Sequence, residues 1–176
     1  LFDRQVIIDR STLADLQREF VAALAVPPGV DNEPRLGPFL QPQLDGTPDG
    51  FAIRFLGWDA SQIDWNTLER QNLHESATAS IPELGVTLSP TAALRYPKPT
   101  DPERPYQLLI EEVEPDAPLD DRYNATHLWE TTRSAKFERM LTETGVALGV
   151  LSNGKQIRLF YAPRGETAGH ITFDVT

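Results

Sequence analysis

The segment Leu108–Asp116, "LLIEEVEPD", constrains the fold most, because an apolar run leads directly into three glutamates. The run predicts a buried strand over Tyr106–Glu114. Side chains alternate between the two faces of a strand, so Glu112 and Glu114 are expected on one face and Glu111 on the other. Carboxylates gathered at a strand end are typical of a divalent-metal site. They are equally compatible with a solvated strand end that enters an acidic loop.

The last third of the chain carries the clearest further signals. Residues at helical spacing predict a helix that begins near Trp129 and stops at Gly145. Asn153-Gly154 predicts a type I′ hairpin turn, because both central positions of that turn need a positive φ. The strands expected here are Val146–Leu151, Gln156–Tyr161 and His170–Val175.

Signals earlier in the chain are weaker. Thr12-Leu-Ala-Asp15 matches a capping box, and a helix is expected from there to Pro27-Pro28-Gly29. In the irregular stretch that follows, Phe39 and Leu40 are expected to insert into the core. The other expected elements are a strand over Phe51–Trp58, a helix over Asp59–Asn72, a strand over Gly85–Tyr96 interrupted at Ser89-Pro90, a turn over Pro97–Pro105 and an acidic loop over Pro115–Tyr123.

Helices and strands in this order predict one compact domain of mixed α/β class. We expect residues 1–50 to form an N-terminal helix and an irregular lead-in, and residues 51–176 to form the core. The length of 176 residues and a hydrophobic content of 40% fit a single globular core. Because the chain starts at Leu1 without a methionine, we expect a fragment of a longer protein.

Composition excludes several classes of function. The chain has no cysteine, which excludes thiolate metal sites and cysteine nucleophiles and fits the reducing cytoplasm. No apolar run approaches the roughly 18–20 residues of a membrane span, so no membrane partner is expected. The formal net charge is −10, without the basic footprint typical of nucleic-acid binding. Any contact with DNA must therefore use a local patch or the rest of the parent protein.

The order strand, proline-rich turn, acid-tipped strand, helix and "LSNG" hairpin resembles the restriction-endonuclease-like nuclease superfamily. It resembles in particular the nuclease-type domains at the head of type I and combined restriction–modification proteins, over about residues 51–176. The resemblance implies a restriction-endonuclease-like mixed sheet flanked by helices, with a C-terminal antiparallel hairpin. Such domains carry an Asp on one strand and a Glu-x-Lys at the end of the next, and their carboxylates hold Mg²⁺.

This sequence departs from that motif at two of its three positions. The Asp position falls near Thr91 or Ala92, Glu112 matches the Glu, and Glu114 stands at the Lys position. The resemblance thus implies a degenerate catalytic and metal-binding site at Glu112 and Glu114. No cofactor is expected, or Mg²⁺ if the site is active.

A second resemblance lies in the tail, "FERMLTETGVALGVLSNGKQIRLFYAPRGETAGHITF", with "GPFL" upstream. These segments resemble the N-terminal region of large bacterial proteins that carry an adenine-specific DNA methyltransferase, including those of DISARM-type phage-defence systems. The chain lacks an Asn-Pro-Pro-Tyr tetrad and a cofactor-binding glycine-rich loop. The methylating machinery is therefore expected beyond Thr176. The implied partners are DNA and the other domains or subunits of a modification or defence complex.

The basic residues of the last third are the candidates for contact with DNA. They can form a phosphate-contacting strip, or a solvated face with ion pairs to neighbouring glutamates. The candidates are Lys136, Arg139, Lys155, Arg158 and Arg164.

Three functions remain open. The preferred one is a nuclease-like domain without catalysis that serves DNA recognition or scaffolding in a modification or defence protein. The second is an active Mg²⁺-dependent endonuclease with a migrated site, in which Glu75 or Asp101 replaces the missing Asp and Lys98 supplies the cation. The third is a pure protein-interaction domain. The first two require the strand around Val113 to lie beside the segment around Thr91.

Overall fold

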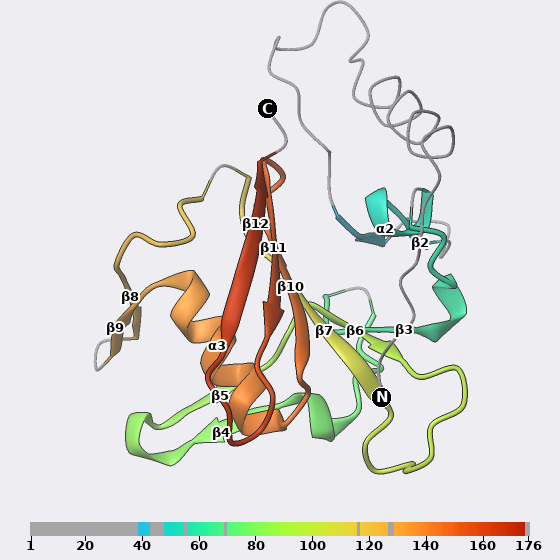
Figure 1. Ribbon diagram of the computed structural model, residues 1–176, viewed down its shortest axis with the longest axis horizontal. Coiled ribbons are helices and arrows are strands. Elements are labelled where there is room, and N and C mark those ends of the chain that lie inside the picture. The colour runs from blue at the N-terminus through green and yellow to red at the C-terminus, as the bar shows by residue number, and fades with distance from the viewer. Residues whose placement is uncertain are drawn as a thin grey trace, which may run out of the picture.

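The computed structural model describes residues 39–42, 48–54, 56–68, 70–115, 117–126 and 129–174 (Figure 1). Its centre is a six-stranded mixed sheet in the order β12-β11-β10-β7-β6-β3. The expected mixed α/β class is confirmed. The helix expected after Thr12 lies outside the described residues. The sheet strands are β3 Ile63–Trp65, β6 Ala92–Arg95, β7 Tyr106–Glu112, β10 Leu148–Ser152, β11 Gln156–Tyr161 and β12 Gly169–Asp174.

One half of the sheet consists of β3, β6 and β7, and the other half consists of β10, β11 and β12. Neighbouring strands within each half are antiparallel. β3 pairs with β6 and β6 with β7, all antiparallel, and Ala92 lies opposite Ile110. β7 and β10 are parallel, with Leu109 opposite Gly149. Parallel neighbours need a crossover connection, and α3, Arg133–Thr144, lies within this one. The expected neighbourhood of the Val113 and Thr91 segments is confirmed.

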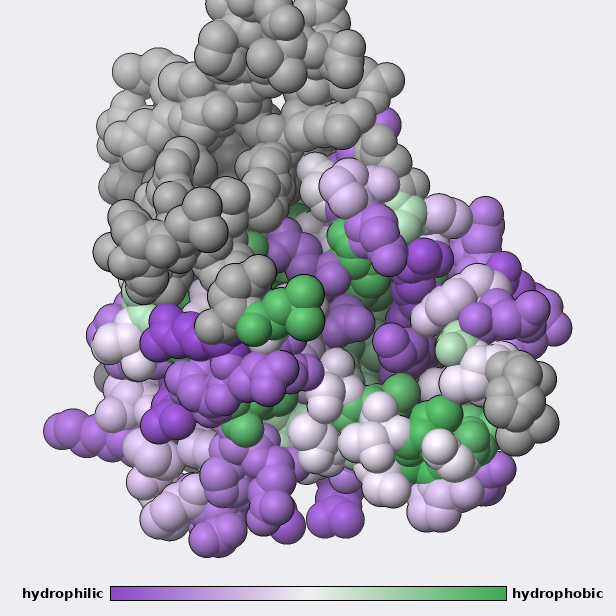
Figure 2. All heavy atoms as spheres, turned by 180° about the vertical axis from the view of Figure 1, so that it is seen from behind, coloured by the Kyte–Doolittle hydropathy of each residue, from purple (hydrophilic) through white to green (hydrophobic). Residues whose placement is uncertain are grey.

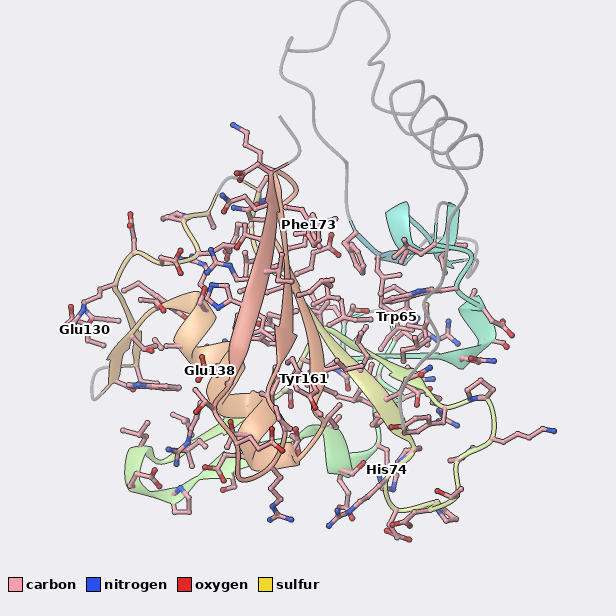
Figure 3. The ribbon with its side chains drawn as sticks, in the orientation of Figure 1. Trp65, His74, Glu130, Glu138, Tyr161 and Phe173 are labelled. Atoms are coloured by element: carbon pink, nitrogen blue, oxygen red, sulfur yellow. The ribbon has the colours of Figure 1, made fainter. Side chains whose placement is uncertain are left out.

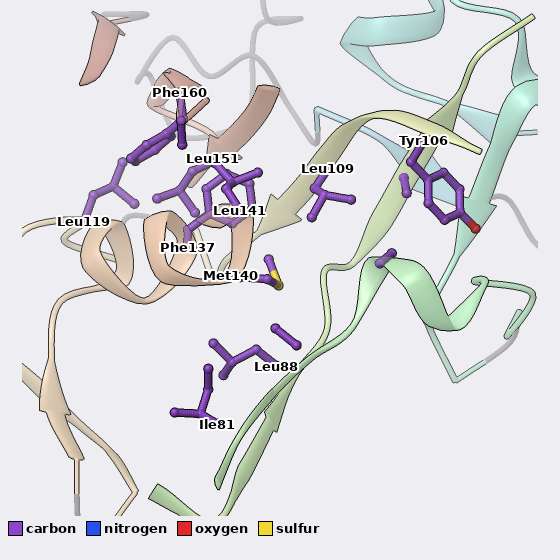
Figure 4. Close-up of a cluster of buried hydrophobic side chains, with 14 residues drawn as sticks. Ile81, Leu88, Tyr106, Leu109, Leu119, Phe137, Met140, Leu141, Leu151 and Phe160 are labelled. Carbon is purple, nitrogen blue, oxygen red and sulfur yellow. The ribbon is translucent and has the colours of Figure 1, made fainter. Parts of the chain in front are cut away.

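α3 packs against one face of the sheet (Figure 4). Phe137, Met140 and Leu141 of the helix meet Leu109 and Leu151 of the sheet in one buried cluster. The Phe137 ring lies edge-on to Phe160, with ring centroids 5.3 Å apart. The helix begins where the Thr132 side chain accepts the Ala135 N–H, and it ends at Gly145, whose φ of 74° is left-handed. α3 therefore covers this face of the sheet.

The opposite face of the sheet carries a second buried cluster. Phe39, Leu40 and Ala52 pack there on Trp65 and Ile110. The expected insertion of Phe39 and Leu40 into the core is confirmed, so the core already includes part of the region expected as a lead-in.

Smaller elements surround this core. They are β1 Gln41–Pro42, β2 Pro48–Asp49, α2 Phe51–Arg54, η1 Ala60–Gln62, η2 Glu75–Ala77, β4 Ala79–Ile81, η3 Pro82–Leu84, β5 Val86–Leu88, β8 Tyr123–Thr126 and β9 Trp129–Thr131. β1 pairs with β2, β4 with β5 and β8 with β9. On the side opposite to that of Figure 1, much of the described surface is hydrophilic, with smaller hydrophobic patches between (Figure 2). No helix among the described residues is long and apolar enough to cross a membrane.

Two expected elements are wrong. The strand predicted over Phe51–Trp58 is the short helix α2, and the helix predicted over Asp59–Asn72 is η1 followed by the edge strand β3. Asp59 caps η1 through the Ser61 N–H, and the Asn72 side chain accepts the Trp65 N–H instead of continuing a helix. Side-chain bonds to the backbone compete with helical bonds in this way.

Other boundaries shift by a few residues. β7 ends at Glu112 rather than Glu114. Trp129 belongs to β9 and not to the helix. The interruption at Ser89-Pro90 separates β5 and β6, which lie in different sheets. In the predicted hairpin, Ser152 pairs with Ile157 and the Asn153 N–H donates to the Gln156 carbonyl, so the turn is centred on Gly154 and Lys155, one residue late.

Candidate functional site at the end of strand β7

Glu111 meets partners from two neighbouring elements. The Thr91 N–H and hydroxyl lie 3.1 and 3.4 Å from Oε2 of Glu111. Lys136 of α3 brings its Nζ to 3.7 Å from Oε1 of the same carboxylate. Burial raises the pKa of Glu111, while Lys136 and Thr91 oppose that rise. The carboxylate of a strand residue and the ammonium group of a helix residue thus face each other at this end of the sheet.

Glu112 points to the opposite face. Its carboxylate accepts the backbone N–H of Phe39 and, at 3.3 Å, that of Leu40. Burial raises the pKa of Glu112 to about 7, and the two backbone hydrogen bonds oppose this rise. The side chain therefore anchors the Phe39–Leu40 segment to the end of β7.

Glu114 follows β7 and is exposed. Its carboxylate lies 3.5 Å from Nη2 of Arg133 at the start of α3. A hydrogen bond from its own backbone N–H and the contact with Arg133 lower its pKa. Since the strand ends at Glu112, the alternation that was expected to pair Glu112 with Glu114 does not extend this far. The structure gives these two carboxylates separate partners.

A pocket of about 370 Å³ opens where the end of β7 meets α3. Charged residues line it together with the apolar residues Val113, Phe137 and Met140. The Arg133 guanidinium lies over the Tyr123 ring at 4.7 Å from its centroid, a cation–π contact. The charged residues that line the pocket are Glu111, Glu112, Glu114, Arg133 and Lys136.

Metal ligands are not gathered in the described part of the chain, where no group of three or more His, Cys, Asp or Glu could hold a metal ion. At the position expected for an Asp, Thr91 offers a hydroxyl that already contacts Glu111. Of the residues expected as substitutes, Glu75 lies in η2, and Lys98 and Asp101 lie in the turn between β6 and β7. That turn leads into Tyr106, the end of β7 opposite to Glu112, and the two ends of this strand are on the order of 20 Å apart at about 3.3 Å per residue. None of these three candidates lines the pocket.

The predicted DNA-contacting residues do not form one free strip. Lys136 pairs with Glu111. Arg139 pairs with Glu83 at 3.0 Å and with Glu143 at 2.8 Å. Arg164 is exposed in the loop between β11 and β12, and Lys155 is half-buried in the hairpin turn.

Arg158, which was predicted to contact DNA, is a buried residue whose side chain is only 5% exposed. Its guanidinium donates to both carboxylate oxygens of Asp120, with Nη2 2.9 Å from Oδ2. It also donates to the hydroxyls of Ser134 and Thr172. This pairing lowers the pKa of Asp120. The fork joins β11, β12, α3 and the acidic loop.

A second buried network escaped sequence reasoning. Asp64 of β3 is 3% exposed. It accepts the Tyr106 hydroxyl at 2.7 Å and also accepts Nε of Arg95. The Tyr106 hydroxyl in turn accepts the His74 N–H. Burial is the largest cause that raises the pKa of Tyr106 to about 12. An acidic residue between Ile63 and Trp65 was the one sequence signal for this network.

No family model matches this chain, and searches of curated proteins and of solved structures find no similar protein. The geometry at the end of β7 is therefore what bears on function.

Proposed function

We propose that this chain is a nuclease-like α/β domain without metal-dependent catalysis that serves as a scaffolding or recognition module of a bacterial DNA modification or anti-phage defence protein. The observation that carries the proposal is the state of the strand-end carboxylates. Glu111 is held by Thr91 and Lys136, and Glu112 by backbone N–H groups. Carboxylates that coordinate Mg²⁺ must turn their oxygens to the ion, whereas these are turned to the protein.

The topology supports a nuclease-like scaffold of the restriction-endonuclease type. A meander of β3, β6 and β7 is followed by α3 and the parallel strand β10, with acids at the end of β7. Thr91 stands beside these acids, where the resembled family carries an Asp. We therefore infer a nuclease-like scaffold that lacks part of the chemistry of the resembled family.

The charges favour scaffolding over DNA recognition. Lys136, Arg139 and Arg158, which are three of the five predicted DNA contacts, are held by carboxylates of the same chain. A cation that is already paired releases fewer counterions when it approaches a phosphate, so it adds little to affinity. With a net charge of −10, the domain is better suited to basic protein surfaces of a larger complex.

The second candidate is an Mg²⁺-dependent endonuclease whose lysine has moved from the strand to the helix. The observation in its favour is the contact of Glu111 with Lys136 beside an open pocket. In this case Glu111, and not Glu112, is the metal ligand. Because Thr91 offers no carboxylate, a water molecule or a phosphate oxygen of the substrate would have to complete the coordination of the ion.

Incubation with supercoiled plasmid and Mg²⁺ or Mn²⁺ separates the two. We expect no nicking and only weak retardation of DNA at low salt, where electrostatic binding is strongest. Nicking that Glu111→Gln abolishes and Glu83→Gln preserves would establish the endonuclease, since Glu83 pairs with a helix cation outside the pocket. Strong retardation without nicking would favour the recognition role over scaffolding.

A further inference from the structure

Among the described strands, β12 pairs only with β11. Its six residues pair with β11 in continuous register, from Gly169 opposite Tyr161 to Asp174 opposite Gln156. It lies at the end of the sheet, and no described strand pairs with its other edge. Five of its residues are exposed, and Thr172 is half-buried. The strand has no proline, lysine or bulge, which are the devices that usually protect an edge.

The face beside this edge is apolar. Ile171 is 65% exposed and Phe173 51%. Ile171 lies opposite Leu159, and Tyr161 lies opposite Leu148, so four exposed apolar side chains share this face with Phe173. Tyr161 and Phe173 stand on the adjacent strands β11 and β12 (Figure 3). A contiguous apolar patch beside an open edge is typical of a surface that receives another strand.

The sequence of β12 complements itself in one antiparallel register. With Thr172 opposite its own counterpart, Ile171 lies opposite Phe173 of a second copy, and the pairing occurs twice by symmetry. On the other face, His170 lies opposite Asp174 of the second copy. Apolar residues thus meet apolar ones, and an imidazole meets a carboxylate. Both kinds of cross-strand pair are stabilising.

We propose that two copies of this chain associate by antiparallel pairing of β12 with β12, centred on Thr172, to form one continuous sheet. The occupant of the edge is a second copy because the strand supplies both halves of each cross-strand pair. This assembly goes beyond the proposed function and does not depend on it. It leaves the pocket at the end of β7 outside the interface, since two strands, β10 and β11, separate β7 from β12.

Charge reversal tests the register. We expect a dimer in sedimentation equilibrium with the whole chain. His170→Asp places two carboxylates opposite each other and should raise the dimer dissociation constant at least tenfold. The double variant His170→Asp/Asp174→Lys restores opposite charges and should recover most of that loss. Circular dichroism of each variant verifies that the monomer remains folded.

A single cysteine tests the symmetry axis. The chain has no cysteine, so Thr172→Cys introduces a unique thiol that faces its counterpart across the proposed axis. Cα atoms of directly opposed residues lie about 4.5–5.5 Å apart, within the range that a disulfide spans. Mild oxidation should yield a covalent dimer with Thr172→Cys and none with Ser80→Cys, an exposed position on β4.

Either of two results overturns the proposal. One is a chain that stays monomeric at every concentration, which would leave the edge to a strand of another protein. The other is a dimer that survives His170→Asp unchanged and does not cross-link through Thr172→Cys, which would place the contact elsewhere.

Discussion

The carboxylate of Glu112 accepts the backbone N–H of Phe39, a residue 73 positions earlier in the chain. The bond joins the end of a central strand to a segment that packs under the same face of the sheet. Glu112 was a candidate metal ligand by the resemblance to nucleases, and its carboxylate accepts backbone N–H groups. It therefore contributes to the architecture of the domain.

The stability of the fold should depend on the protonation of Glu112. Burial raises the pKa of this carboxyl to about 7 from an ordinary value of 4.5. Between these two values the folded chain binds more protons than the unfolded chain, so the free energy of unfolding falls as the pH rises through this window. At 1.36 kcal/mol per unit of pKa, the loss is at most about 3 kcal/mol.

Urea denaturation at pH 5 and pH 8 measures this loss. Glu112→Gln keeps an acceptor for the Phe39 N–H and cannot ionise, so its free energy of unfolding should change less between the two pH values than that of the wild type. Glu130→Gln, at an exposed position on β9, should behave like the wild type. Equal pH dependence in the wild type and Glu112→Gln would mean that the carboxylate is not the responsible group.

A close approach of α3 to the sheet depends on Gly149. A Cβ atom at this position would lie 2.6 Å from the Phe137 ring and 2.8 Å from the Leu141 side chain. Gly149→Ala should therefore lower the free energy of unfolding by about 1–3 kcal/mol, the usual cost of overpacking a core. Gly169→Ala is the matched control, because nothing lies within 4 Å of a Cβ there. Thermal denaturation of both variants measures the difference, and equal midpoints would contradict the prediction.

The elements that sequence reasoning predicted correctly are those with local causes. Gly145 ends α3 in a left-handed conformation, and Gly154 takes a positive φ in the hairpin. The apolar run before Glu111 forms the central strand. The misassigned region has non-local causes, since β3 is fixed by Asp64, whose hydrogen-bond partner Tyr106 lies 42 positions later. Periodicity over a short window does not contain such a contact.

The candidate site was predictable only in part, for the same reason. Acids at the end of a buried strand could be read from the sequence. Their partners could not, because Lys136 reaches Glu111 only through the crossover from β7 to β10. The exact end of β7 also decides whether Glu114 shares a face with Glu112, and strand ends are the least predictable part of an element.

The buried Arg158 should depend on Asp120 for its stability. Asp120→Asn removes the charge that both Nη atoms of the guanidinium contact, leaving a buried cation with neutral partners only. Because Asp120 itself is largely exposed, water replaces part of the lost interaction, and we expect a cost of about 1–3 kcal/mol. Asp121→Asn, at the exposed neighbouring position, should cost much less in the same chemical denaturation experiment. Equal costs would show that the fork contributes little.

The hydroxyl of Tyr106 should stabilise the meander of β3, β6 and β7. It donates to Asp64 and accepts the His74 N–H, both at 2.7 Å. Tyr106→Phe therefore leaves a backbone donor without its acceptor and removes one hydrogen bond from the buried carboxylate of Asp64. We expect a loss of about 1–3 kcal/mol in the free energy of unfolding. Tyr96→Phe, at an exposed position just after β6, is the matched control and should change little. Amide hydrogen exchange locates the effect: the His74 amide should exchange faster in Tyr106→Phe, and an unchanged rate would mean that this amide is protected by another group.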